Sequence, residues 1–409
     1  MFSAAARHAS APTPASSAVA ARAHGAVSAG WQPVVGRDGR PIGFRLGLHG
    51  HAPGQTAAAL LDEMLDGFRA EGASGMPHGL VVLAPFDLPA DESLAYWGAP
   101  RNVLLEVGQR WLGEPDVAGW LLRAQRHGVR LALRLDGAQL PLPEQLAPFQ
   151  YLVADGMPPR PRRDIAMLVL GACTPVDADN AFAAGASGVI GWPVEPPTAG
   201  AALHPQQRAL LDLIRLVQGD ADVGDIEAGF KREPVLAYML LTLANSPAFM
   251  RAQPIASLAN AIQLLGYQRL VKWLVLLLVI ASKSSKALPA IYCAVVRGLL
   301  LENCAAAIGA APQIRDECFV VGAFSLLDRV TGRSLSQLTA DLVLPDPVQA
   351  AITGAGGPYA PYVALAQALE GGDAAAMRHA GAVVGLDTAA VNAALLKALA
   401  TNDALQTLV

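Results

Sequence analysis

The pattern of hydrophobic residues changes character near residue 200, and this change constrains the fold more than any other feature. Before it, short runs rich in Val, Leu and Ile alternate with segments of helical periodicity. The runs are apolar on both faces, as in strands of a parallel sheet covered by helices. They are VVLAP at 81–85, NVLLEV at 102–107, VRLALRL at 129–135, FQYLVAD at 149–155, IAMLVL at 165–170 and SGVIGW at 187–192. This alternation predicts a β/α barrel or an open parallel sheet.

The segments between these runs predict helices at 56–70, 116–127 and 176–184, with Asp177 as a capping residue of the last one. One connection has no room for a helix. Between residues 154 and 165 the chain has prolines at 158, 159 and 161, and proline disfavours the α conformation in the residue before it. Parallel neighbours joined without a crossover helix are unusual. We therefore expect a truncated or distorted barrel.

Beyond a linker at 193–205 the chain shows helical periodicity alone. Apolar residues recur at three- and four-residue spacing from Ile255 to Leu265, which is typical of the buried face of an amphipathic helix. Further amphipathic or alanine-rich stretches cover 290–310, 319–331, 362–369 and 388–401, and glycines at 266, 309 and 332 mark expected helix ends. This half is predicted to be an α-helical bundle.

Charge and composition exclude several kinds of partner. The 30 Lys and Arg residues are balanced by 34 Asp and Glu with no long run of either sign, so we expect no nucleic-acid partner. The most apolar window, 270–281, contains Lys272 and is shorter than the roughly 20 apolar residues of a membrane span. The first 30 residues lack the apolar stretch of a secretion signal. We expect a cytoplasmic protein with a disordered tail at 1–30 and no membrane partner.

Three segments of the helical half carry a family resemblance. They are PVLAYMLLTLANSPAF at 234–249, PIASLANAIQLLG at 254–266 and RLVKWL at 269–274. In these segments and their spacing the chain resembles HDOD domains, which are similar in fold to HD-superfamily phosphohydrolases. Two further segments, VVRGLLLENCA at 295–305 and VVGAFSLLDRVTGRSLSQL at 320–338, resemble the subgroup in which a degenerate EAL domain precedes the HDOD domain.

The N-terminal half is similar to that EAL domain in WQPVVGRDGRPIGFRL at 31–46, NVLLEV at 102–107, HGVRLAL at 127–133 and GASGVIGWPVEPP at 185–197. The resemblance implies a degenerate EAL-type β/α barrel at 31–197 and an α-helical HDOD domain at 198–409. Active EAL domains are phosphodiesterases that open cyclic di-GMP with metal-bound water. Two hard divalent cations need several carboxylate ligands.

The resemblance also implies that this carboxylate cage is lost. Arg45 stands in place of the signature glutamate, Val82 of the asparagine, Arg134 and Leu135 of the paired aspartates, Val153 of the lysine and Cys173 of the late glutamate. Glu106 alone remains, and a one-residue shift would add Asp136. One or two carboxylates cannot hold two divalent cations. We expect Glu106 to be a vestigial residue in an ion pair with Arg45 or Arg134 on adjacent strands.

The helical half lacks the ligands of the HD superfamily. Those enzymes bind metals through several histidines and an adjacent His-Asp pair. Here no histidine lies between His204 and His379, and the chain has no His-Asp dipeptide. We therefore expect no catalytic residue, no metal site and no cofactor.

With both sites emptied, we expect a non-enzymatic bacterial signalling scaffold or adaptor that binds protein partners. Family analogy implies a cyclic di-GMP-linked process such as motility, biofilm formation or virulence. The candidate partner surface is Tyr267, Arg269, Lys272 and Trp273, because aromatic and Arg side chains are enriched at interfaces; a core position for Trp273 is the alternative. A nucleotide receptor with Arg45 and Arg134 at the phosphates and a residual phosphodiesterase are the less favoured functions.

Overall fold

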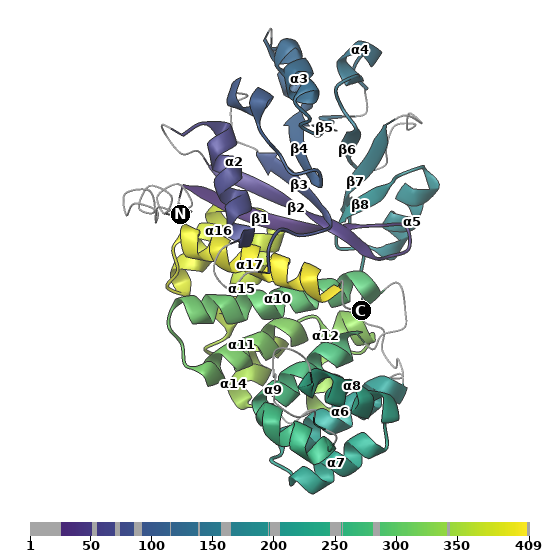
Figure 1. Ribbon diagram of the computed structural model, residues 1–409, viewed down its shortest axis with the longest axis vertical. Helices are drawn as coiled ribbons and strands as arrows, with labels where there is room; N and C mark the ends of the chain where they lie inside the picture. The colour runs from purple at the N-terminus through teal and green to yellow at the C-terminus, as the bar shows by residue number, and fades with distance from the viewer. Residues whose placement is uncertain are drawn as a thin grey trace, which may run out of the picture.

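The protein consists of a β/α barrel joined to a bundle of helices, as the computed structural model shows (Figure 1). The described residues are 26–50, 55–69, 74–85, 92–114, 116–137, 140–156, 165–194, 196, 205–245, 255, 257–280, 287–341 and 344–406. In Figure 1 the barrel lies at the top and the helices from residue 205 onward lie below it. The predicted order of a β/α barrel followed by a helical bundle is confirmed.

Eight strands close the barrel in chain order. They are β1 (Val27–Val35), β2 (Pro41–Gly50), β3 (Leu80–Pro85), β4 (Val103–Gly108), β5 (Leu131–Arg134), β6 (Tyr151–Asp155), β7 (Ala166–Ala172) and β8 (Gly188–Gly191). β1 is antiparallel to both β2 and β8, and the pairs from β2 to β8 are parallel. Because β1 begins at Val27, the expectation of a disordered tail over 1–30 is wrong for residues 27–30.

The barrel is complete in strands, so its distortion lies in the covering helices. Between the strands lie α2 (Ala57–Asp66), α3 (Val117–Arg126), α4 (Pro143–Leu146) and α5 (Pro175–Ala183). α4 has only four residues. β6 and β7 pair directly in parallel, and most of the proline-rich connection between them, 157–164, lies outside the described residues.

The start of α5 differs in detail from the prediction. Thr174, rather than Asp177, is the capping residue, and its hydroxyl accepts a hydrogen bond from the backbone N–H of Asp177 at 3.2 Å. The Asp177 carboxylate accepts bonds in return from the Thr174 hydroxyl and N–H, at 2.8 and 2.9 Å. These bonds favour the charged carboxylate, so they lower the pKa of Asp177.

Each described element from residue 205 onward is a helix. The helices are α6 (Pro205–Gln218), α7 (Val223–Lys231), α8 (Pro234–Ala244), α9 (Leu258–Ile280), α10 (Leu288–Ala307), α11 (Pro312–Phe324), α12 (Leu327–Thr331), α13 (Leu335–Asp341), α14 (Asp346–Thr353), α15 (Ala360–Gly371), α16 (Ala374–Val383) and α17 (Thr388–Gln406). Gly309 and Gly332 follow α10 and α12 with φ of 74°, as predicted. Gly266 has non-helical φ and ψ of 72° and 161°, so the first part of α9 ends there, as predicted, and a second helical part follows after a kink.

One described helix, α10, is long and apolar enough to cross a membrane, and 72% of its most apolar window is buried inside the protein. α16 and the first part of α17 pass the same test together, but they meet at 98°. Burial of this kind is typical of a core helix. The apolar window at 270–281 falls in the second part of α9, up to Ile280.

Strand β1 joins the two halves of the molecule. Its edge toward α17 is held by the Asn392 side chain, which accepts from Ala29 N at 3.1 Å and donates to Val27 O at 2.6 Å. The Trp31 ring lies 6.1 Å from that of Tyr292 in α10. In Figure 1, α15, α16 and α17 lie directly beneath this strand. The barrel and the bundle therefore share one continuous apolar core.

Candidate functional site

Four charged side chains meet at the carboxyl ends of the parallel strands, the end at which β/α barrels carry their active sites. Arg45 comes from β2, Glu106 from β4, Arg134 from β5 and Asp155 from β6. Their side chains face the barrel interior because they share the inward face with the apolar residues that fill it, such as Val82 and Leu104.

Arg45 and Glu106 form a buried bidentate ion pair. Arg45 Nε donates to Glu106 Oε2 at 2.7 Å and Arg45 Nη2 to Oε1 at 2.6 Å. The two side chains are 6% and 4% exposed. Arg45 is in register with Val82 on β3, and Val82 with Leu104 on β4, two residues before Glu106. The guanidinium therefore reaches across β3 to meet the carboxylate.

Arg134 extends this pair into a row of alternating charges. Its Nη1 lies 3.7 Å from Glu106 Oε1, and its Nη2 donates to Asp155 Oδ2 at 2.7 Å. The structure thus brings Glu106 together with both arginines considered from the sequence. Sequence reasoning missed Asp155, although a carboxylate directly after the apolar run of β6 is a recognisable signal for a residue at the mouth of a barrel.

The other positions of the expected cage do not supply metal ligands. Val82 and Val153 are buried in the barrel interior and Leu135 is also buried. The Asp136 carboxylate accepts the backbone N–H of Arg110 at 3.0 Å. Within the described ranges, no group of three or more His, Cys, Asp or Glu side chains is arranged to hold a metal ion. The donor set at this mouth does not fit two divalent cations.

The thiols of the protein differ in burial. Cys173 is exposed, whereas Cys293, Cys304 and Cys318 are buried. Burial raises the pKa of Cys304 and of Cys318 to about 12 and that of Cys293 well above its usual value. We expect one thiol per chain to react rapidly with a chromogenic disulfide reagent at pH 8, and all four after unfolding. Rapid reaction that persists in Cys173→Ser would contradict this assignment.

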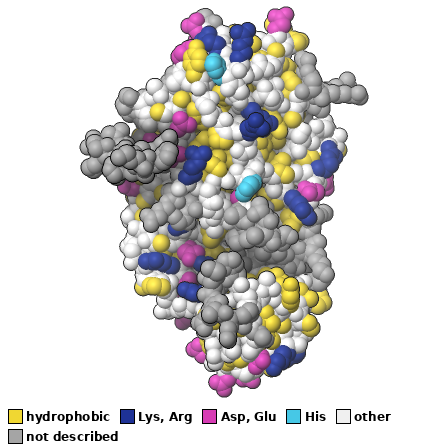
Figure 2. Space-filling view, in the orientation of Figure 1, with side chains coloured by type: hydrophobic (Ala, Val, Ile, Leu, Met, Phe, Trp, Pro, Cys, Tyr) yellow, Lys and Arg dark blue, Asp and Glu magenta, His cyan; other side chains and the backbone are white. Residues whose placement is uncertain are grey.

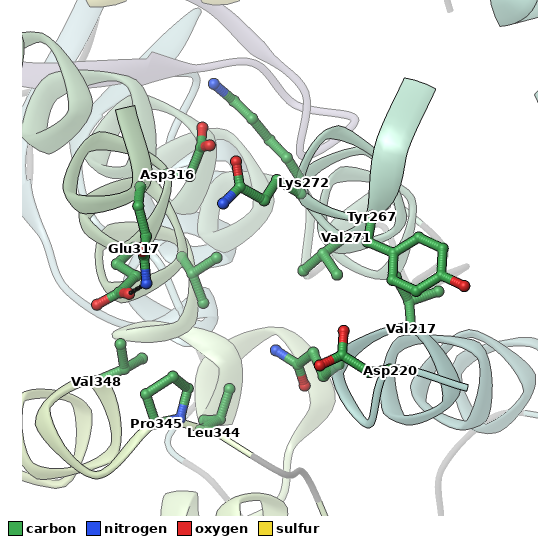
Figure 3. Close-up of a pocket in the computed structure, with 14 residues that line it drawn as sticks. Val217, Asp220, Tyr267, Val271, Lys272, Asp316, Glu317, Leu344, Pro345 and Val348 are labelled. Atoms are coloured by element: carbon green, nitrogen blue, oxygen red, sulfur yellow. Dashed lines mark hydrogen bonds between the residues drawn. The ribbon is translucent and has the colours of Figure 1, made fainter. Parts of the chain in front are cut away.

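A second candidate site is a groove in the helical half (Figure 3). It has a volume of about 260 Å³. It lies between the end of α6, the middle of α9, α11 and the start of α14. Two residues of the expected partner surface, Tyr267 and Lys272, line it.

Both of these side chains have partners inside the protein. The Tyr267 hydroxyl donates to Ala221 O at 2.6 Å. Lys272 forms an ion pair with Glu302, and its ammonium lies 4.7 Å from the centroid of the Phe319 ring. The Lys272 charge is therefore balanced and is not free to attract an acidic partner.

Trp273 and Arg269 do not join Tyr267 and Lys272 in one surface. Trp273 is partly buried and stacks on Phe230, with ring centroids 6.3 Å apart, in accord with the alternative that placed it in the core. Arg269 is exposed and does not line the groove. Of the four residues expected as a partner surface, Tyr267 and Lys272 thus line the groove and the other two do not.

A second buried ion pair, which sequence reasoning missed, lies in the bundle. Arg297 Nε and Nη2 each donate to the Glu370 carboxylate at 2.6 Å, and Arg297 Nη1 donates to Ser325 Oγ at 2.9 Å. Burial lowers the pKa of Arg297, but the charge and hydrogen bonds of Glu370 outweigh it and raise the pKa overall. Glu370 and Arg45 line the same cavity of about 140 Å³ between the barrel and the bundle.

Comparison with known proteins identifies one domain of the chain. An HDOD domain is found at residues 205–314, from the start of α6 to the start of α11. This finding confirms the HDOD part of the predicted architecture. No significant match is found among curated proteins.

Solved structures give slight similarities. The MucR phosphodiesterase in complex with cyclic di-GMP is 13% identical, with a TM-score of 0.28 and coverage of 40% of this chain and 89% of that one. The EAL enzyme Bd1971 in its cGMP-bound form is 12% identical, with a TM-score of 0.28 and coverage of 45% and 67%. The Bacillus subtilis YkuI protein, which has an EAL domain and is bound to cyclic di-GMP and calcium, is 13% identical, with a TM-score of 0.29 and coverage of 41% and 54%. Similarity of this degree assigns no activity to the chain.

Proposed function

We propose that this protein is a non-enzymatic bacterial signalling scaffold or adaptor that acts by binding other proteins in a cyclic di-GMP-linked pathway. The observation that carries the proposal is the Arg45–Glu106 ion pair, at 2.6 and 2.7 Å. A divalent cation at Glu106 would have to displace a bidentate guanidinium and remain beside its charge. The resemblance of the N-terminal half to degenerate EAL domains, together with the HDOD domain, supports the pathway.

The sizes of the cavities favour an adaptor over a nucleotide receptor. The cavity next to Arg45 has a volume of about 140 Å³ and the helical groove about 260 Å³, whereas small-molecule sites usually have about 300–1,000 Å³. Arg134 is 25% exposed at the mouth of the barrel, but its guanidinium already donates to Asp155. A phosphate group would have to compete with that carboxylate.

The surface charges agree with a protein partner. In the view of Figure 2, Lys and Arg side chains are interspersed with Asp and Glu side chains over both halves of the molecule. Phosphate backbones and anionic membranes attract clustered positive charge. We therefore propose protein partners rather than nucleic acid or a membrane, and a cytoplasmic location.

Turnover and binding assays with cyclic di-GMP test the proposal. We expect the purified full-length protein with Mg²⁺ or Mn²⁺ to leave cyclic di-GMP intact by chromatography, while an active EAL phosphodiesterase consumes it in the same buffer. Calorimetry is expected to show no binding heat. Micromolar binding that is lost in Arg134→Ala would instead identify a nucleotide receptor, and turnover would identify a phosphodiesterase.

A further inference from the structure

We infer that the groove between α6, α9, α11 and α14 is the docking site for a basic amphipathic helix of the partner protein. This inference rests on the proposed function and adds the location of the contact and the chemistry of the partner. The groove belongs to a wall of four helices, and a helix that lays its apolar face into such a groove is a recurring mode of recognition.

The floor of the groove is apolar. It is formed by Val217, Val271, Val320, Leu344 and Val348. The volume of about 260 Å³ is below the usual range for a nucleotide-sized ligand. It suits a few apolar side chains that project from one face of a helix at spacings of three and four residues.

The walls of the groove are acidic. Asp220, Asp316 and Glu317 line it, and Lys272 is the one cation among the described residues of its lining. Glu302 already balances the charge of Lys272. Figure 3 shows Asp220 and Asp316 on opposite sides of the hollow. The net charge therefore opposes a phosphate group and favours a guanidinium or ammonium group.

The Glu317 carboxylate is fixed in position by two donors. It accepts the Tyr359 hydroxyl at 2.5 Å and the Gln313 side-chain amide at 3.0 Å. Burial is the main cause that raises the pKa of Cys318, and the charges of Glu317 and Glu302 raise it further. The negative charges of Glu317 and Glu302 therefore also act on Cys318, which lies on the buried side of α11.

The backbone conformation at Asp220 fixes the position of its carboxylate. Asp220 has φ of 50°, and it is the one non-glycine residue with positive φ in the described part of the chain. Glycine adopts this conformation at lower cost than any residue with a Cβ atom. No side-chain hydrogen bond to another described residue offsets the cost at Asp220. Asp220 follows the end of α6, where the backbone N–H of Ala221 donates to Leu216 O at 3.1 Å, so this conformation belongs to the C-terminal cap of the helix. The cap places the Asp220 carboxylate among the residues that line the groove.

Fluorescence anisotropy with the full-length protein tests the docking site. The probe is a labelled 16-residue helical peptide with Leu on one face and Arg beside it, and its counterpart has Glu in place of Arg. We expect the Arg peptide to bind, with affinity that falls as salt rises. Asp220→Lys/Asp316→Lys should weaken binding at least tenfold. Asp179→Lys, which reverses one exposed charge on α5, is the control for a charge change outside the groove and should bind as the wild type does.

A second variant distinguishes a loss of peptide binding from a loss of folding. Asp220→Gly removes the carboxylate and relieves the left-handed backbone, so we expect a higher melting temperature together with weaker binding of the Arg peptide. The docking site is refuted if the Arg peptide does not bind, if the Glu peptide binds equally well, or if the charge-reversed variant binds as tightly as the wild type. If the peptide assays fail in this way while cyclic di-GMP shows neither turnover nor binding, the docking site is wrong and the adaptor proposal is unaffected. Turnover of cyclic di-GMP would overturn the adaptor and leave the peptide result intact.

Discussion

Replacing Glu106 with alanine is expected to lower the free energy of unfolding by about 3–5 kcal/mol, the usual cost of leaving a buried charge without its partner. Arg45 would keep its guanidinium inside the barrel, where it is 6% exposed, with its two short bonds to the carboxylate removed. Arg134 would keep its bond to Asp155, and because it is itself a cation it could not replace the lost carboxylate. Urea unfolding followed by tryptophan fluorescence measures the change.

Two further variants separate the buried charge from the loss of a side chain. Glu92→Ala breaks the ion pair of Arg123 and Glu92, whose side chains are 39% and 61% exposed, and should cost less than about 1 kcal/mol. Arg45→Met/Glu106→Leu removes both charges of the barrel pair and is expected to recover most of the lost stability. If Glu106→Ala unfolds within about 1 kcal/mol of the wild type, the Arg45–Glu106 pair is not the buried contact described here.

Replacing Asn392 with leucine is expected to loosen the contact between the barrel and the bundle. β1 pairs with β8 only at Val34 and Val35, so Ala29 N–H and Val27 C=O on that edge depend on the Asn392 side chain. Asn392 is 1% exposed, and leucine of similar size would leave both groups buried without partners. Each unsatisfied group costs about 1–3 kcal/mol, so we expect a total loss of about 2–6 kcal/mol.

Urea unfolding measures the loss, and limited proteolysis locates it. We expect faster cleavage in β1 and α17 of Asn392→Leu, while β3 to β7 remain protected. Asn180→Leu, at an exposed position on α5, makes the same change in composition and should fall within about 0.5 kcal/mol of the wild type. An Asn392→Leu protein as stable and as resistant as the wild type would show that the two halves do not depend on this contact.

The elements that the sequence predicted well are those in which local pattern and burial agree. The apolar runs at 81–85 and 102–107 became β3 and β4, with residues buried on both faces, and 290–310 became the core helix α10. The β1–β2 hairpin was not among the strands predicted from apolar runs. In β2 the large apolar residues are interrupted by Gly43, Arg45 and Gly47, which are themselves buried, so the strand has no continuous apolar run. Such positions are buried by contacts with distant parts of the chain.

For the candidate sites, the sequence supplied residue types and the structure supplied their partners. The resemblance to EAL domains placed Arg45 at the position of a glutamate, and this expectation argued against a metal site. Two arginines on predicted neighbouring strands were both possible partners of Glu106. The distances from their guanidinium groups to the carboxylate decide between them, and these distances come from the structure. Arg45 makes the bidentate contact, while Arg134 turns mainly to Asp155. The acidic groove was not predicted, because Asp220, Lys272 and Asp316 are far apart in the chain.

By itself, therefore, the sequence determined the class of each half and the residue types available at the candidate sites, because hydrophobic periodicity and residue identity are local properties that need no coordinates. The tertiary structure alone decided that β1 links the barrel to α15, α16 and α17, that Lys272 is neutralised by Glu302, and that carboxylates surround the groove. These features depend on distances between residues that the chain brings together only when distant apolar surfaces pack into one core, and no local pattern encodes such a distance.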